Sequence, residues 1–236
     1  MEVALYGRAT AFGIEGASLD TQMTTTILLI RHGQTRSNVT GYYMGWSNED
    51  LDEVGYDQAR KLSARLVGLP LASVYTSPLQ RAHTTASIIA KPHGLEVKPL
   101  DDLIEIKLGD WEGLHESEIE RRWPELWRQS QVDPSGLAFP NGESFGQVAE
   151  RAVRAFDAVV AANQGKQAVI VTHDIIVRIL AAYVMGVPNS IYRRIKANNA
   201  SLSVVWVNEG AKRLATLNDT SHFETMPSSP SWRAAL

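Results

Sequence analysis

The sequence predicts an α/β protein: a three-layer sandwich with a mostly parallel central sheet flanked by helices. Short apolar, β-rich runs alternate along the chain with longer segments whose apolar residues recur at helical spacing. Strands that alternate with helices form mostly parallel sheets covered on both faces. The chain has 236 residues, of which 44% are hydrophobic, and a chain of this length can bury a full core without disulfides or metals.

The first half of the chain contains three predicted strands and two predicted helices. The strands are expected at residues 25–30, 72–76 and 95–100, and the helices at residues 55–66 and 79–90. The run TTILLI at 25–30 is nearly all apolar, which is typical of a strand buried on both faces. The run LEVKPL at 95–100 alternates instead, which favours a strand near an edge of the sheet.

The second half begins with a segment at residues 114–142 that is rich in Trp, Glu and Pro, and we expect it to leave the sheet as a helical cover. A long amphipathic helix follows at residues 144–162. A buried strand at 168–171 and a helix at 174–184 come next, and the runs at 202–207 and 213–217 form a predicted antiparallel pair.

The chain is expected to form one domain over residues 24–224, with residues 114–142 as its cover segment. Residues 1–23 are rich in Gly and Ala without a clear period, and we interpret them as an N-terminal extension. Residues 225–236 are rich in Pro and Ser and are interpreted as a C-terminal tail.

Composition and charge exclude several classes of protein. Lys plus Arg is 23 and Asp plus Glu is 26, so the formal net charge is −3, which argues against a general nucleic-acid binder. The most apolar stretch, residues 175–187, contains Arg178 and is shorter than the ~18 residues of a membrane span. There is no cysteine, which removes disulfides, thiolate nucleophiles and Cys-based metal sites. We expect a cytoplasmic protein without a signal peptide. The sequence is compatible with a homodimer.

Three of the predicted strands end in basic or imidazole side chains. The first is followed by Arg31 and His32, the second leads to Arg81, and the strand at 168–171 leads to His173. Because the carboxyl ends of parallel strands meet at one edge of a sheet, these groups are expected around one pocket. Arginines repel a metal cation but bind a phosphate dianion bidentately, so the sequence predicts a phosphate site without a metal. Gly33 would let the backbone approach that ligand closely.

Five ordered motifs carry a resemblance to the histidine phosphatase superfamily, in its phosphoglycerate-mutase-like branch. They are RHGQTRSN at 31–38, YTSPLQRAHTTA at 75–86, LIEIKLGDWEG at 103–113, PNGESF at 140–145 and VTHD at 171–174. The chain looks closest to the compact bacterial phosphatases of that branch, which include broad-specificity, alpha-ribazole and metal-independent phosphoserine phosphatases. One departure is Asp174, which stands where the family usually has glycine.

The resemblance implies a role for each matched residue. His32 would be the nucleophile and form a phosphohistidine, which requires a neutral imidazole. Glu105 would protonate the leaving alkoxide and then activate water. Phosphate would be bound by four side chains: Arg31, Asn38, Arg81 and His173. No metal or other cofactor is implied.

Further residues are candidates for contact with the rest of the substrate. They are Gln34, Thr35, Leu108, Asp174 and His222. Leu108 gives the pocket wall an apolar side chain three residues after Glu105, where some phosphoserine-specific relatives carry a polar group. His222 belongs to a C-terminal segment that returns toward the site in similar phosphatases.

The predicted function is a metal-independent phosphomonoesterase that acts on a small phosphorylated metabolite, phosphoserine-like or of broad specificity. A 2,3-bisphosphoglycerate-dependent phosphoglycerate mutase is the alternative, because Gly45 and Trp46 resemble the mutases. However, the basic residues of the mutase cover are not recognisable between Gly113 and Gly142. A non-catalytic module that binds a phosphorylated ligand is a third hypothesis.

Overall fold

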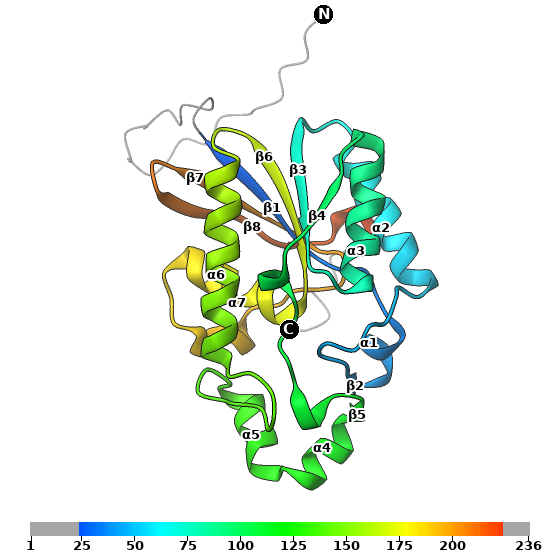
Figure 1. The fold of residues 1–236 in the computed structure, drawn as a ribbon, viewed down its shortest axis with the longest axis vertical. Coiled ribbons are helices and arrows are strands. Elements are labelled where there is room, and N and C mark those ends of the chain that lie inside the picture. Colours follow the sequence, from blue (N-terminus) through cyan, green and yellow to red (C-terminus); the bar gives the residue numbers. More distant parts are fainter. Residues whose placement is uncertain (1–23, 224–236) are drawn as a thin grey trace, which may run out of the picture.

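Four of the strands, β4, β3, β6 and β1, run parallel in a six-stranded sheet of the order β4-β3-β6-β1-β7-β8 (Figure 1). The computed structural model describes residues 24–223. The strands are β1 (Thr25–Arg31), β3 (Leu71–Thr76), β4 (Val97–Pro99), β6 (Gln167–Thr172), β7 (Leu202–Asn208) and β8 (Ala211–Asp219). β7 runs antiparallel to β1, and β8 runs antiparallel to β7. The predicted mostly parallel sheet is confirmed, with the run at 95–100 at its edge as β4.

Helices cover both faces of the sheet and complete the predicted three layers (Figure 1). They are α2 (Glu53–Leu66) and α3 (Gln80–Ala90) on one face, and α6 (Phe145–Ala162) and α7 (Asp174–Met185) on the other. Side chains of β1 alternate between the two cores, because successive residues of a strand point to opposite faces. Ile27 and Leu29 pack with α6 and α7, whereas Leu28 and Ile30 pack with α2 and α3.

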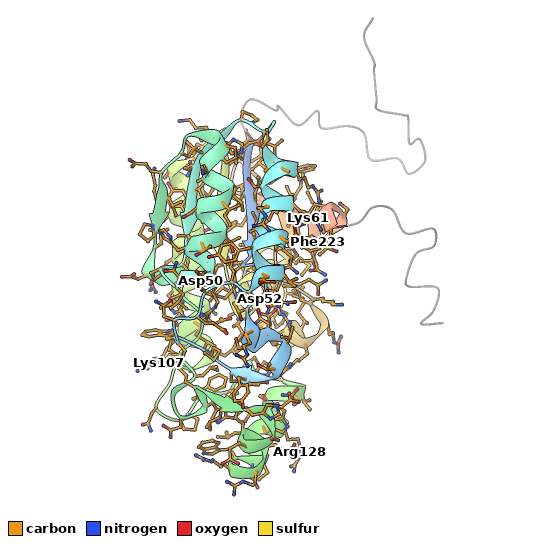
Figure 2. All side chains as sticks on the ribbon, turned by 90° about the vertical axis from the view of Figure 1, so that its right-hand side faces the viewer. Asp50, Asp52, Lys61, Lys107, Arg128 and Phe223 are labelled. Carbon is orange, nitrogen blue, oxygen red and sulfur yellow. The ribbon has the colours of Figure 1, made fainter. Side chains whose placement is uncertain are left out.

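Side-chain caps set where two of these helices begin. The Asp52 carboxylate accepts a hydrogen bond from the Gly55 backbone N–H at 2.7 Å, so α2 starts two residues before the predicted position. Figure 2 shows Asp52 at this end of α2. The Ser144 hydroxyl accepts from the Gln147 N–H at 3.2 Å and begins α6. Each cap satisfies a backbone donor that the helix itself leaves free.

The segment at residues 114–142 lies beyond the ends of the parallel strands, as Figure 1 shows. It contains β5 (Leu114–His115), α4 (Glu116–Arg122) and α5 (Pro124–Val132), and β5 pairs with β2 (Tyr42–Tyr43). Trp111 is fully buried, and its ring lies 5.0 Å from that of Phe139 and 6.2 Å from that of Trp127. This aromatic cluster fixes the segment against the rest of the chain.

Several short elements have no periodic signal in the sequence. The helix α1 (Arg36–Thr40) follows β1 directly, and 3-10 turns occupy Lys91–His93, Asp101–Leu103, Gly109–Trp111, Asn189–Arg194 and Ser221–Phe223. The expected extension at 1–23 and tail at 225–236 lie outside the described residues. Within residues 24–223, no helix is long and apolar enough to span a bilayer.

Candidate active site

A cavity of about 330 Å³ opens where β1 ends, between the sheet and the 114–142 segment. Seven of the residues singled out in the sequence line it: Arg31, His32, Asn38, Arg81, Glu105, Leu108 and Asp174. They come from the end of β1, from loops and from the helices α1, α3 and α7, and lie up to 143 positions apart in the chain. The parallel sheet brings them together because its strands end at the same edge. We call Arg31, His32, Asn38, Arg81, Glu105 and His173 the phosphate cup.

His32 is buried, and its ring has a defined orientation. Nδ1 lies 2.6 Å from the Gly33 carbonyl oxygen. Since a carbonyl only accepts hydrogen bonds, Nδ1 carries the proton and Nε2 of the neutral ring has a free lone pair. Burial, followed by the positive charges of Arg81 and Arg31, lowers the pKa of His32 well below its ordinary value of 6.5. The imidazole is therefore neutral at neutral pH, and the lone pair of Nε2 is available for chemistry.

His173 lies beneath the cavity, fully buried, with its ring centroid 5.1 Å from that of His32. Its Nε2 lies 2.7 Å from the Ser77 hydroxyl, and its Nδ1 has no hydrogen-bond partner among the described residues. Burial and the Arg81 charge lower the pKa of His173 well below 6.5. The ring is thus neutral and retains one uncommitted nitrogen close to His32.

Asp174 holds the guanidinium group of Arg31. Nη1 of Arg31 donates to the Asp174 carboxylate at 3.2 Å and to the Ala197 carbonyl at 2.6 Å, whereas Nε is buried without a partner in the described chain. Asp174 also accepts from Nε of Arg178 at 3.0 Å and from the Tyr192 hydroxyl at 3.3 Å. These contacts leave Nε and Nη2 of Arg31 for a ligand, and they engage the Asp174 carboxylate with three protein donors.

Arg81 and Asn38 are fixed by the neighbouring loops. Arg81 is buried and donates to the Ser47 and Gly45 carbonyls, at 2.8 Å each. The Asn38 side-chain oxygen accepts from the Thr35 backbone N–H at 3.1 Å. A planar guanidinium with its orientation fixed in this way suits bidentate recognition of phosphate oxygens.

Glu105 supplies a carboxyl group at the side of the cup. Its Oε1 accepts from the Ile106 N–H at 2.9 Å, and its backbone carbonyl accepts from Trp46 Nε1 at 2.6 Å. Burial raises the pKa of Glu105 above 4.5, the Asp174 charge adds to this, and the Ile106 N–H, Arg81 and Arg31 oppose it. A raised pKa suits a group that must hold a proton and release it.

Three of the predicted contact residues do not line the cavity. The Gln34 amide donates to the Asp52 carboxylate at 2.9 Å and so points to α2. Thr35 is fully buried, with its hydroxyl 2.9 Å from that of Ser37. His222 packs on α2, where Arg65 Nη1 lies 3.4 Å from its Nδ1. Leu108 and Asp174 do line the cavity.

Glycine is required at position 33 for a different structural reason from the one expected. A Cβ added at Gly33 would lie 2.6 Å from the Gly55 carbonyl oxygen at the start of α2. Gly33 does not line the cavity, and its N–H donates to the Thr85 hydroxyl at 3.1 Å. The glycine therefore makes room for α2 and not for a ligand.

The remaining wall of the cavity, which we call the outer chamber, is largely aromatic and aliphatic. It consists of Ser37, Gly41, Tyr42, Tyr43, Met44, Gly45, Ile106, Leu108, Trp111, Ser130, Pro134, Phe139, Phe145, Ile175, Tyr192 and Arg193. Tyr192 and Arg193, which lie in the 3-10 turn Asn189–Arg194, were not among the residues predicted from the sequence. Nor was Ser77, which contacts His173, or Asn199, whose side-chain N–H donates to the Asn38 side-chain oxygen at 2.8 Å. A serine followed by Pro78 after a strand was a signal for Ser77, whereas no pattern marks the 3-10 turn. Among residues 24–223, no group of three or more His, Asp or Glu side chains could hold a metal ion.

Curated relatives are similar in sequence to most of this chain. A bifunctional protein of Mycobacterium tuberculosis is 36% identical over 202 residues, which is 84% of this chain and 55% of that protein. The chain thus spans about half the length of these mycobacterial relatives. Phosphoserine phosphatase 1 of Hydrogenobacter thermophilus is 33% identical over 83% of this chain and 93% of its own. A probable phosphoglycerate mutase of Serratia proteamaculans is 32% identical over 84% and 95%.

Solved structures agree with the fold. Bacillus stearothermophilus YhfR superimposes with a TM-score of 0.82 at 33% identity, over 85% of this chain and 100% of that one. A mycobacterial glucosyl-3-phosphoglycerate phosphatase gives a TM-score of 0.76 at 27% identity, over 83% and 99%. The model of the histidine phosphatase superfamily (branch 1) matches residues 27–220. With the five motifs, the cup and these matches in agreement, the chain belongs to branch 1 of the histidine phosphatase superfamily.

Proposed function

We propose that the protein is a metal-independent phosphomonoesterase that hydrolyses a small phosphorylated metabolite through a phosphohistidine on His32. The observation that carries this proposal is the His32 ring, which is buried, neutral and oriented by Gly33 with Nε2 free, between two arginines. We further propose residues 24–224 as the catalytic domain, with the segment 114–142 as its cover.

In the first step the phosphate dianion binds between Arg31 and Arg81, with Asn38 and His173 on its other oxygens. Nε2 of His32 attacks phosphorus, the N–P bond forms, and the P–O bond to the alcohol breaks. Glu105 donates its proton to the departing alkoxide. Positioning and charge neutralisation supply most of the rate in phosphoryl transfer, and the two guanidinium groups provide both.

In the second step Glu105, now ionised, takes a proton from water. The water oxygen attacks phosphorus, the N–P bond breaks, and inorganic phosphate leaves with His32 neutral again. Glu105 returns to its protonated form, so the cycle is balanced. The raised pKa of Glu105 suits both transfers because it lies closer to the working pH than that of an ordinary carboxyl.

Release of inorganic phosphate from a panel of esters tests the proposal. The panel holds phosphoserine, 3-phosphoglycerate, sugar phosphates, alpha-ribazole phosphate and p-nitrophenyl phosphate, all with excess EDTA. We expect turnover of at least one metabolite that EDTA does not reduce. Hydrolysis that EDTA abolishes, or no hydrolysis of any ester, contradicts the proposal.

A phosphoglycerate mutase is the second candidate, and the similarity to the Serratia proteamaculans protein favours it. A mutase must return the phosphoryl group to an alcohol before water arrives. The chain is mixed with 3-phosphoglycerate and a 2,3-bisphosphoglycerate primer. Fast interconversion to 2-phosphoglycerate with little free phosphate would establish the mutase in place of the phosphatase.

A further inference from the structure

Arg193 brings a cation to the outer chamber that the cover segment does not supply. The basic residues of α4 and α5, Arg121, Arg122 and Arg128, do not line the cavity (Figure 2 labels Arg128). Arg193 does line it, although it lies in the 3-10 turn Asn189–Arg194, far along the chain from the cover. The cavity thus receives its basic group in the outer chamber from the turn Asn189–Arg194 and not from the stretch between Gly113 and Gly142.

Two contacts fix the orientation of the Arg193 side chain. Nε and Nη2 both donate to the Ser130 carbonyl, at 2.8 and 2.6 Å, near the end of α5. The guanidinium also lies over the Tyr192 ring, 5.5 Å from its centroid. A guanidinium has five N–H donors, so both donors of Nη1 and one of Nη2 remain. These form the end-on fork that matches the two oxygens of a carboxylate.

The charge of Arg193 is also unmatched by the protein. The other charged groups in the cavity are Arg31 and Asp174, which pair with each other, and Arg81 and Glu105 of the cup. None of the ion pairs among residues 24–223 includes Arg193. An oriented cation without a counter-ion, in a chamber otherwise lined mainly by apolar groups, is suited to an anionic part of a ligand.

We propose that Arg193 is a specificity-determining residue that binds a carboxylate on the alcohol portion of the substrate, at the opposite end from the transferred phosphate. The substrate class is then a small phosphate monoester that carries a carboxylate. For its phosphate end this inference rests on the proposed function. The Tyr192 ring, whose hydroxyl donates to Asp174, connects the carboxylate site to the cup.

A matched pair of ligands tests this assignment. O-phosphoserine and O-phosphoethanolamine differ only by the carboxylate, and their binding is measured by calorimetry on the His32→Ala chain, which cannot turn them over. In that background we expect Arg193→Gln to weaken phosphoserine binding about ten- to a hundredfold and to leave phosphoethanolamine binding within about twofold. Arg194→Gln is the control, because Arg194 is exposed like Arg193 but does not line the cavity.

Arg193 also donates to the Ser130 carbonyl near the end of α5, so it could have a purely structural role. The measurements distinguish that role from binding of a carboxylate. Loss of structure would lower the thermal midpoint and weaken both ligands equally, which would overturn the proposal. Arg193→Lys keeps the charge without the fork and should give an intermediate loss for phosphoserine alone. Equal affinities of phosphoserine and phosphoethanolamine for the His32→Ala chain that retains Arg193 would also overturn the proposal. Failure of the proposed function is read separately, as absence of hydrolysis by the wild-type chain.

Discussion

The phosphate cup and the outer chamber line one cavity but are built in different ways. The cup consists of charged and imidazole groups at strand ends and in the motifs that follow them, each held by backbone carbonyls or buried partners. The outer chamber consists mainly of apolar side chains from the 41–45 loop, the cover and the 3-10 turn Asn189–Arg194. We therefore expect the cup to determine which bond is broken and the outer chamber to determine which molecule is bound.

The two regions also differ in the charged groups they contain. The cup holds Arg31, Arg81 and Glu105, with Arg31 paired to Asp174, whereas in the described chain Arg193 is the one charged residue of the outer chamber, where it contacts the Ser130 carbonyl and the Tyr192 ring. Substitutions in the cup should change the rate with every ester, and substitutions in the outer chamber should change the choice among esters. The following predictions test that division.

The largest effect is expected for His32→Ala. Without the imidazole there is no nucleophile for phosphorus, so kcat for p-nitrophenyl phosphate should fall by about 10⁴-fold or more. His83→Ala, a histidine of α3 outside the cavity, is the control and should keep wild-type activity. Equal rates for wild type and His32→Ala would remove His32 from the reaction.

Glu105→Gln should reduce the rate according to the leaving group. With an alkyl ester such as phosphoserine, kcat/KM should fall about 10³-fold, because the alkoxide needs a proton. With p-nitrophenyl phosphate, whose phenolate leaves unprotonated, the loss should be about tenfold or less in this step. Because Glu105 also activates water in the second step, which both esters share, the comparison is made on kcat/KM, which ends at phosphorylation. An equal loss of kcat/KM with both esters would contradict the role of Glu105 as the acid.

The pH dependence of kcat/KM tests the role of Glu105 in a second way. In the wild type the acid limb of kcat/KM should lie below pH 6.5, because burial lowers the pKa of His32, which must be neutral. The basic limb should lie above pH 4.5, because burial raises the pKa of Glu105, which must be protonated. Glu105→Gln should remove the basic limb, and its persistence would assign that limb to another group.

Asp174→Asn should have a moderate effect. Weaker fixation of Arg31 should raise KM about tenfold for every ester, and loss of the negative charge should lower the pKa of Glu105 and move the basic limb to lower pH. Asp157→Asn is a matched control, since Asp157 accepts from the Tyr183 hydroxyl at 2.8 Å and pairs with Lys212 outside the cavity. An unchanged KM and pH profile in Asp174→Asn would show that Arg31 needs no such partner.

The smallest effect is expected for His222→Ala. His222 lies against Arg65 of α2 and does not line the cavity. Its removal should leave kcat/KM within about twofold and lower the free energy of unfolding by about 1 kcal/mol. A tenfold rise in KM measured for any ester of the panel would place this segment in contact with substrate after all.

The sequence predicts the cup better than the outer chamber for a physical reason. Arg31, Arg81 and His173 follow apolar strands, and a parallel sheet must bring those strand ends to one edge. Tyr192 and Arg193 lie in a 3-10 turn without hydrophobic periodicity, and their position depends on how α7 and the cover pack. Gln34 shows the reverse case, because its place in a motif predicted a contact with substrate. Its side-chain amide instead donates to Asp52 and points away from the cavity.

A phosphorylated imidazole at residue 32 is the central intermediate of the proposed mechanism. Wild-type protein is mixed with ³²P-labelled phosphoserine or p-nitrophenyl phosphate, quenched in base during turnover, and digested for peptide mapping. We expect an acid-labile, base-stable label on the peptide that contains His32, and no label in His32→Ala. Turnover without label on residue 32, or label on another residue, would contradict the central claim.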